Sequence, residues 1–297
     1  MTLSAEAFAW VSALVHRESA IVLSPGKEYL VESRLLPLAR DEGLPDVASL
    51  VARLRTVPDR RTVARLVEAM TTNETSWFRD GTPFEAFRSM VVPELLALPP
   101  QRRINIWSAA CSSGQEAYTI AMILAEEVLP RGRAADILGT DISQAMLERT
   151  REGCYGQLEI GRGLPAPMLV RHFQRHGTEW RVNDRLRAMV RVQHLNLADR
   201  WPMLPVFDVV FLRNVLIYFD TETKRAILRR VRQVLSPQGF LFLGGAETTL
   251  GLDEDGWTRT TVHGFTLYRP IPGGTHAAPA LTTAPPAVQG LAATTGR

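Results

Sequence analysis

The sequence is poor in cysteine, and it lacks the features that mark metal-binding, disulfide-bonded or membrane proteins. Its 297 residues include only two cysteines, Cys111 and Cys154, and neither belongs to a CxxC pair. This predicts neither a metal site nor a disulfide framework, and it suits a reducing cytoplasm. No apolar run reaches the roughly 18–20 residues that span a bilayer. The N-terminus, MTLSAEAFAW, lacks the charged-then-apolar layout of a signal peptide.

An excess of charge of one sign is also missing. The sequence has 34 Lys and Arg against 31 Asp and Glu, which gives a net charge of +3. Binding to nucleic acid through the charge of the whole molecule is therefore not indicated. Hydrophobic residues make up 45% and charged residues 22%, as is typical of a globular protein that buries a sizeable core.

Three patterns follow one another along the chain. Residues 1–90 carry four helical stripes of apolar residues separated by Pro and Gly breakers, which predicts an all-α N-terminal domain and linker. Residues 91–270 are expected to form a second domain, in which apolar strands alternate with amphipathic helices from Ile104 onward, the pattern of a mostly parallel α/β sheet. Residues 271–297 are rich in Pro, Gly, Ala and Thr, and we expect this tail to be disordered.

The alternation is interrupted at about residues 153–194, which are rich in Gly and Pro. Trp180–Val182 and Ala188–Val192 are candidate short strands there, so we expect an inserted subdomain with a small β-hairpin. Further strands are expected at Phe207–Leu212 and Phe240–Leu243, and Gly264–Arg269 should form an antiparallel last strand.

The stretch Ile104–Asp141 predicts a strand, a loop of small residues, a helix, and a second strand that ends in an acid. A right-handed crossover of this kind brings the loop and Asp141 to the same edge of a parallel sheet, where nucleotide-like ligands bind. The loop does not match GxGxxG, so it fits a ligand without a pyrophosphate. Asp141 is placed to accept hydrogen bonds from ribose hydroxyls, or alternatively to cap the helix that begins at Gln144.

Other polar residues fall at the same predicted edge. Glu116 closes an S-x-x-E capping box with Ser113, or alternatively faces the ligand and binds an ammonium group. Asn196 and Leu197 follow a strand-like run, where folds of this type bind an adenine ring. Arg213 and Asn214 directly follow the strand Phe207–Leu212, at the same edge.

Five stretches, in this order, resemble the CheR-type chemoreceptor methyltransferases. They are Thr71–Arg79 (TTNETSWFR), Ala110–Tyr118 (ACSSGQEAY), Gly139–Ser143 (GTDIS), Leu195–Leu197 (LNL) and Arg213–Phe219 (RNVLIYF). Gln115 and Ala117 stand where the family usually has an acid and a proline. The resemblance covers about residues 1–270. It implies a Rossmann-like class I methyltransferase sheet with an antiparallel last strand, an all-α N-terminal domain and a small β-hairpin insertion.

The resemblance also implies a reaction. The family transfers a methyl group from S-adenosylmethionine to the γ-carboxylate of receptor glutamates, giving a glutamyl methyl ester and S-adenosylhomocysteine, without a metal. Arg79 and Tyr218 would be the catalytic residues. The cofactor-binding residues would be Asn73, Thr75, Arg79, Glu116, Asp141, Asn196, Leu197, Arg213 and Asn214. A glutamate carboxylate, with a reference pKa of about 4.3, is ionised at neutral pH and needs no general base.

Two clusters of arginines are candidate partner surfaces. Arg53, Arg55, Arg60, Arg61 and Arg65 surround a single acid, Asp59, and a second cluster lies at Arg171, Arg175, Arg181, Arg185, Arg187 and Arg191. A basic helical face would suit the acidic helices of a chemoreceptor, although an ordinary solvated face is an alternative. In the family, the hairpin subdomain can bind a short C-terminal peptide of some receptors by strand addition, so a receptor C-terminal peptide at the inserted hairpin is a further candidate partner.

Two alternatives to a receptor methyltransferase remain open. One is a small-molecule methyltransferase on the same fold, and the other is a non-catalytic S-adenosylmethionine-binding adaptor of a chemosensory array. Arg79 has its own alternative, a surface ion pair with Asp80 or Glu85. We expect a cytoplasmic monomer that binds the cytoplasmic domain of chemoreceptors, with no nucleic acid and no membrane insertion. The sequence does not identify the receptor, the modified glutamates or the pathway.

Overall fold

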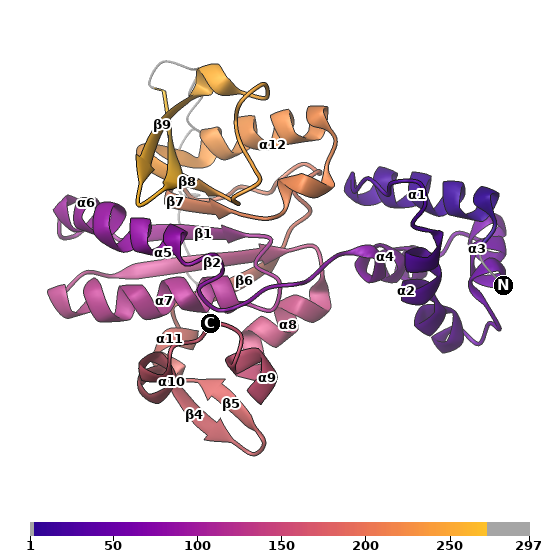
Figure 1. Ribbon diagram of the computed structural model, residues 1–297, viewed down its shortest axis with the longest axis horizontal. Coiled ribbons are helices and arrows are strands. Elements are labelled where there is room, and N and C mark those ends of the chain that lie inside the picture. The colour runs from indigo at the N-terminus through magenta and orange to yellow at the C-terminus, as the bar shows by residue number, and fades with distance from the viewer. Residues whose placement is uncertain (1–2, 272–297) are drawn as a thin grey trace, which may run out of the picture.

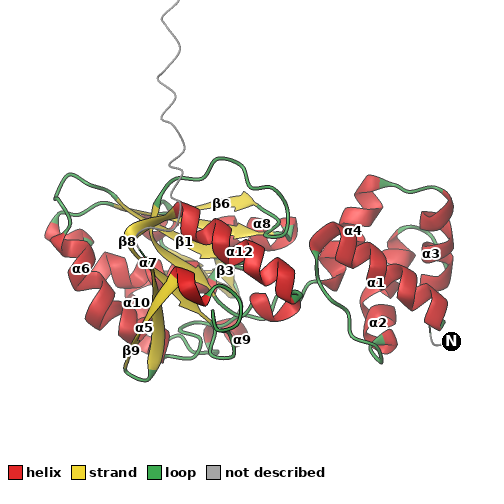
Figure 2. Ribbon diagram, turned by 90° about the horizontal axis from the view of Figure 1, so that it is seen from above, coloured by secondary structure: helices red, strands yellow, loops and turns green. Residues whose placement is uncertain are grey.

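The computed structural model describes residues 3–271 as two lobes, a small helical one and a larger one built on a sheet (Figure 1). Figure 2 shows the two lobes side by side, joined by the chain that leaves α4. Except for Ile271, the predicted tail 271–297 lies outside the described residues. Among the described residues, no helix has both the length and the apolar character needed to cross a membrane.

Four helices make up the small lobe: α1 (Ala5–Ser19), α2 (Glu28–Asp41), α3 (Val47–Thr56) and α4 (Arg60–Met70). Three of them are capped at the N-terminus by a side chain that accepts a backbone N–H. The capping residues are Ser4 for α1, Asp46 for α3 and Asp59 for α4. Their apolar stripes, which include the fully buried Leu35 and Leu50, pack on one another. The predicted all-α N-terminal domain is confirmed.

A seven-stranded sheet forms the centre of the large lobe, in the order β6-β2-β1-β7-β8-β10-β9. The strands are β1 (Ile104–Ala109), β2 (Ala135–Asp141), β6 (Val190–His194), β7 (Phe207–Leu212), β8 (Leu235–Leu243), β9 (Trp257–Val262) and β10 (Phe265–Pro270). β10 runs antiparallel to β8 and β9, while the pairs from β6 to β8 are parallel. The predicted fold class is confirmed, but edge strand β9 was not predicted.

Helices cover both faces of the sheet because the strand side chains alternate between two cores. Ile106 and Phe211 point into one core with α5 (Thr82–Ala86), α6 (Val92–Ala97) and α7 (Gln115–Glu127). Trp107 and Leu212 point into the other core with α12 (Thr221–Val234). Outside the insertion, the remaining elements are the π-helix η1 (Phe87–Val91), the α-helix α8 (Gln144–Glu152) and three short 3-10 helices, η2 (Leu129–Arg131), η3 (Leu216–Tyr218) and η4 (Glu254–Gly256).

The insertion, defined here as residues 154–187 between α8 and β6, corrects one prediction. It contains β3 (Cys154–Tyr155), α9 (Gln157–Ile160), α10 (Ala166–His172), β4 (Phe173–His176), β5 (Glu179–Val182) and α11 (Asp184–Arg187). A small antiparallel sheet is present, but β5 pairs with β4 and β3. The run predicted as its partner, Ala188–Val192, instead overlaps β6, which pairs with β2 in the main sheet. β4 escaped prediction because only its first residue is buried.

Candidate functional site

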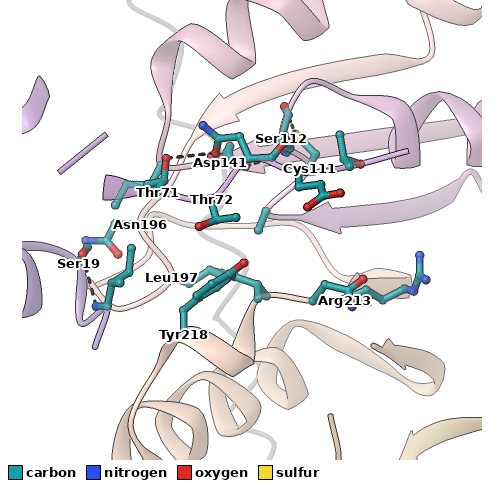
Figure 3. Close-up of a pocket in the computed structure, with 18 of the residues that line it drawn as sticks. Ser19, Thr71, Thr72, Cys111, Ser112, Asp141, Asn196, Leu197, Arg213 and Tyr218 are labelled. Carbon is teal, nitrogen blue, oxygen red and sulfur yellow. Dashed lines mark hydrogen bonds between the residues drawn. The ribbon is translucent and has the colours of Figure 1, made fainter. Parts of the chain in front are cut away.

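All ten predicted site residues line one pocket at the carboxyl ends of β1, β2 and β7. These parallel strands end at the same edge, and the chain crosses to opposite sides of β1 to form β2 and β7. Figure 3 shows Asp141 and Ser112 on one side of the pocket and Tyr218 and Arg213 on the other. The structure therefore brings together residues that lie up to 145 positions apart, since Asn73 and Tyr218 share this pocket.

The loop after β1 has an unusual backbone. Ala110, Ser112 and Gly114 have φ values of 58°, 51° and 92°, so every second residue is left-handed. A Cβ on Gly114 would lie 2.7 Å from Cγ2 of Thr150, which leaves no room for a side chain. The conformation turns the N–H of Ser112 toward Asp141, to which it donates at 2.8 Å. The loop thus presents close-packed backbone to the pocket.

Asp141 is buried at the tip of β2, and each of its carboxylate oxygens accepts one backbone N–H. Oδ2 accepts from Ser112 and Oδ1 from Ser143, the latter at 2.9 Å. Burial raises the pKa of Asp141 above 3.8, although these amides act in the opposite direction. The alternative that Asp141 caps the following helix is wrong, because Ser143 is the N-cap of α8 and accepts from Met146.

Glu116 takes part in an ion pair and not in a capping box. Its Oε1 accepts from Oγ of Ser108 at 2.8 Å, and its Oε2 accepts from Nη1 of Arg213 at 2.9 Å. The N-cap residue of α7 is Gly114, which has no side chain to cap the helix, and Oγ of Ser113 donates to Oε1 of Gln115. The predicted capping box is wrong because the charge of Arg213 attracts the Glu116 carboxylate into the pocket wall.

Arg213 is a buried charge in the wall of the pocket, with its side chain only 2% exposed. Besides Glu116, its guanidinium donates from Nη2 to the carbonyl of Arg79 and to Oδ2 of Asp80, both at 2.8 Å. It also lies over the ring of Phe84 at 5.3 Å. Arg213 therefore joins α7 to the linker segment, by which we mean residues 71–80.

The linker segment supplies Asn73, Thr75 and Arg79 to the pocket. Arg79 donates from Nη1 to the carbonyl of Glu74 at 2.9 Å. The alternative of an ion pair with Asp80 or Glu85 is wrong, because Asp80 pairs with Arg213 and no ion pair of Arg79 occurs within residues 3–271. The carbonyl of Asn73 accepts from Oγ of Ser112 at 2.7 Å, which ties the segment to the loop after β1.

Tyr218 lies half-buried on η3, where the helical lobe reaches the pocket. Its carbonyl accepts from the N–H of Val22 at 2.9 Å, next to a β-bridge between Ile21 and Phe219. Ser19 and Ile21, at the end of α1, line the pocket as well. These two residues were not predicted, because nothing in their local pattern shows that α1 packs against η3.

The remaining predicted residues are held by neighbours on both lobes. Nδ2 of Asn196 donates to the carbonyl of Glu18 at 2.8 Å, and Leu197 is buried beside it. Asn214 has a φ of 57° and donates its N–H to Oε2 of Glu247 at 2.8 Å. Asn196 therefore helps to join the lobes, and Glu247 fixes the turn that follows β7.

The pocket combines acceptors with apolar walls. Each carboxylate oxygen of Asp141 and Glu116 has one protein donor, so lone pairs remain for ligand hydroxyl or ammonium groups. Ile142, Leu195 and Leu197 line the part that would hold a flat ring. The Cys111 thiol, also in the lining, is neutral because burial raises its pKa. These groups fit a nucleoside with an amino-acid tail.

Comparison with known proteins places this site in a family. Residues 73–261 match the model of the CheR methyltransferase SAM (S-adenosylmethionine) binding domain, and residues 6–71 match the CheR methyltransferase all-alpha domain. The chain belongs to the CheR methyltransferase family. The resemblance inferred from the sequence is thus confirmed, and with it a methyltransferase that has a SAM-binding domain.

Relatives with this family's name cover most of the chain. The chemotaxis protein methyltransferase Cher2 of Pseudomonas putida is 42% identical over 245 residues, 81% of this chain and 89% of the relative. Chemotaxis protein methyltransferase 1 of Pseudomonas aeruginosa is 43% identical over 247 residues, with the same shares covered. The chemotaxis protein methyltransferase of Escherichia coli is 33% identical over 276 residues, 90% of this chain and 92% of the relative.

Proposed function

We propose that the protein transfers a methyl group from S-adenosylmethionine to the γ-carboxylate of glutamate residues in chemoreceptors. The observation that supports this most directly is the position of Arg79, which lines the pocket and whose guanidinium, within residues 3–271, has one backbone carbonyl as its hydrogen-bond partner. A cation of this kind suits an anionic acceptor. The products would be a glutamyl methyl ester and S-adenosylhomocysteine.

The cofactor-binding roles follow the chemistry of the lining. Glu116 would meet the ammonium group of the methionyl end, and Asp141 would accept from the ribose hydroxyls. Asn196 and Leu197 would flank the adenine, and Arg213 and Asn214 would form the floor. Asn73, Thr75 and Arg79 would close the methyl-donor site from the linker segment. The bound cofactor supplies a methyl group on a sulfonium, which is already a good leaving group.

Arg79 and Tyr218 would act on the acceptor by orientation. A glutamate carboxylate is ionised at neutral pH, so no residue has to remove a proton from it. Arg79 would hold the carboxylate by charge-assisted hydrogen bonds, and the Tyr218 hydroxyl would donate one more. Holding the acceptor in line with the methyl group and excluding water supplies several kcal/mol, on the order of what positioning contributes in intramolecular reactions.

The proposed partner is the cytoplasmic domain of a chemoreceptor, bound by a monomer of this protein in the cytoplasm. The arginine cluster of α3 and α4 is only partly free to bind such a partner, because acids outside the cluster pair with three of its members. Arg53 pairs with Glu42 at 2.6 Å, Arg55 with Glu6 at 2.7 Å and Arg65 with Asp41 at 2.6 Å. Whether a receptor peptide binds the insertion stays a prediction.

Transfer of labelled methyl from S-adenosylmethionine to receptor cytoplasmic fragments tests the proposal. We expect label on the receptor that is released by base, as a methyl ester requires. Label on a small metabolite and none on receptor glutamate would contradict the proposal and favour the small-molecule methyltransferase. Binding of S-adenosylhomocysteine in a calorimeter without any transfer would favour the adaptor.

A further inference from the structure

The insertion contributes no residue to the lining of the pocket, which passes from Ile142 directly to Leu195. It nevertheless contacts two segments that do line the pocket. These are the linker segment, with Thr75 and Arg79, and the loop after β1, with Ser112. Figure 1 shows the insertion beside α7, and Trp77 of the linker segment belongs to the core on that side of the sheet.

Trp77 is the main contact between the linker segment and the insertion. Trp77 is 1% exposed, and its ring packs edge-on against Tyr155 and Phe173, with centroids 4.8 Å and 5.3 Å away. Its backbone N–H donates to the carbonyl of Arg162 at 3.1 Å. Thr75 and Arg79 lie two positions on either side, so the placement of Trp77 constrains both.

The backbones of the two segments also touch. A Cβ added to Gly163 would lie 2.2 Å from the carbonyl oxygen of Trp77, and Gly163 has a φ of +97°. No other residue fits there unless Trp77 moves. One residue further back, Nη2 of Arg162 pairs with Oε1 of Glu74 at 2.8 Å. The insertion therefore holds the linker segment by main chain, ring packing and charge together.

The other contact involves Tyr155 of β3, which is fully buried. Its hydroxyl donates to the carbonyl of Ser113 at 2.6 Å, within the loop after β1. Burial raises the pKa of Tyr155 well above 10, so the hydroxyl remains a donor. Because Tyr155 also packs on Trp77, one residue of the insertion connects both walls of the pocket.

The linker segment needs such support. Phe78 and Asp80 have φ values of 47° and 68°, a conformation that side chains other than Gly rarely adopt. Strained residues persist only where their surroundings hold them. We propose that the insertion is a positioning element of the active site. Tyr155 of the insertion and Trp77 of the linker segment are the positioning residues, and together they fix the linker segment and the loop after β1. The effect on turnover rests on the role proposed for Arg79.

Gly163→Ala tests this inference, with Gly161→Ala as the matched control. The control adds the same methyl in the same turn, at a φ of −64°, and meets its nearest atoms at ordinary distances of 3.5 Å and more. We expect Gly163→Ala to weaken S-adenosylhomocysteine binding and to lower kcat, each by about tenfold, because small misplacements have large effects on reacting groups. Gly161→Ala should change neither by more than about twofold. Equal effects of the two substitutions on binding would overturn the proposal.

Substitutions of Trp77 separate positioning from stability. Within the described residues, the indole Nε1 has no hydrogen-bond partner, so Trp77→Phe loses no hydrogen bond and keeps an aromatic ring against Tyr155 and Phe173. We expect Trp77→Ala to lower kcat and cofactor affinity, and Trp77→Phe to restore most of both. A Trp77→Ala protein with a lower urea midpoint but unchanged affinity and kcat would show a structural role only. Affinity for S-adenosylhomocysteine does not depend on the methyl acceptor, so this test stands even if receptor glutamate is not the substrate.

Discussion

The sheet side and the linker side of the pocket differ in how fully their polar groups are bonded. On the sheet side, Arg213 and Asp141 are buried, and each makes two or more hydrogen bonds to the protein. On the linker side, Arg79 is half-exposed and donates to one carbonyl. A side chain already held in place can bind a ligand at little entropic cost. A side chain whose donors have no protein acceptor can form hydrogen bonds to an incoming anionic substrate. The sheet side is therefore suited to the cofactor, and Arg79 on the linker side is suited to the acceptor, while Asn73 and Thr75 keep their proposed place beside the cofactor.

Backbone strain, in contrast, occurs on both sides. Of the seven described non-glycine residues with positive φ, five lie at the pocket or in the linker segment: Phe78, Asp80, Ala110, Ser112 and Asn214. Such conformations cost about 1–3 kcal/mol each and cluster at functional sites. The difference between the two sides thus concerns side-chain bonding rather than backbone shape.

The largest effect is expected from Arg213→Met on the sheet side. The substitution leaves the carboxylate of Glu116 and the carbonyl of Arg79 without their partner in a buried wall. Breaking a buried ion pair in this way costs about 3–5 kcal/mol, and we expect a loss of about 3 kcal/mol in the free energy of unfolding. Urea denaturation measures it.

A surface arginine provides the control for Arg213. Arg103 pairs with Asp136 at 3.0 Å, but its side chain is 56% exposed. Arg103→Met should cost less than about 1 kcal/mol, because water already solvates the pair. If Arg213→Met cost no more than this control, the sheet side would not be the rigid part of the pocket.

A smaller effect, and one of a different kind, is expected from Arg79→Lys on the linker side. The ammonium keeps the charge but loses the planar fork that matches a carboxylate. We expect kcat to fall about 30-fold, or about 2 kcal/mol, with little change in unfolding free energy. Affinity for S-adenosylhomocysteine should stay within about threefold of the unchanged protein.

Arg229→Lys is the control for this substitution, since Arg229 is exposed on α12 and neither lines the pocket nor belongs to an arginine cluster. It should leave kcat unchanged. An Arg79→Lys protein that lost cofactor affinity in the same proportion as kcat would assign Arg79 to the cofactor alone, and the proposed division between the two sides would be lost.

Much of the fold could be predicted because buried parallel strands are continuous apolar runs. Every residue of β7 is buried, and the prediction Phe207–Leu212 matches its bounds. β4 and β9 were not predicted because each has a single buried residue, so their sequences resemble loops. Strands at the edge of a sheet carry too little apolar pattern to be found this way.

The site shows the same limit. Short motifs led to ten residues that line one pocket, because each motif sits at a strand end or in the linker segment. Contacts between the lobes left no local signal. Glu68 of α4 accepts from Oγ of Ser143 at 2.5 Å and from the N–H of Ala145 at 2.9 Å, next to Asp141, although it lies 75 residues away. The bond between Glu116 and Arg213, 97 residues further along the chain, likewise has no signal in the local sequence.

The smallest effect is expected at the contact between the lobes, which belongs to neither side of the pocket. Asp220 caps α12 by accepting from the N–H of Thr223 at 2.8 Å, and it also accepts from Nε2 of His16 on α1 at 3.0 Å. These bonds lower the pKa of Asp220 from 3.8 to about 2. Asp220→Ala should cost about 1 kcal/mol of stability at neutral pH, the usual value for an N-cap.

The sign of the pH dependence follows from the lowered pKa. A carboxyl whose pKa falls on folding stabilises the folded state above its unfolded pKa, and this stabilisation is lost as the pH drops toward the folded pKa. The difference between Asp220→Ala and the unchanged protein should therefore be constant near neutral pH and shrink between pH 3.8 and about 2. Asp46→Ala, which removes the cap of α3 and its bond from Ser49, should cost similar stability without altering kcat. Because Asp220 adjoins Tyr218, its loss should lower kcat by about threefold; equal kcat values for the two variants would show that the pocket does not depend on the contact between the lobes.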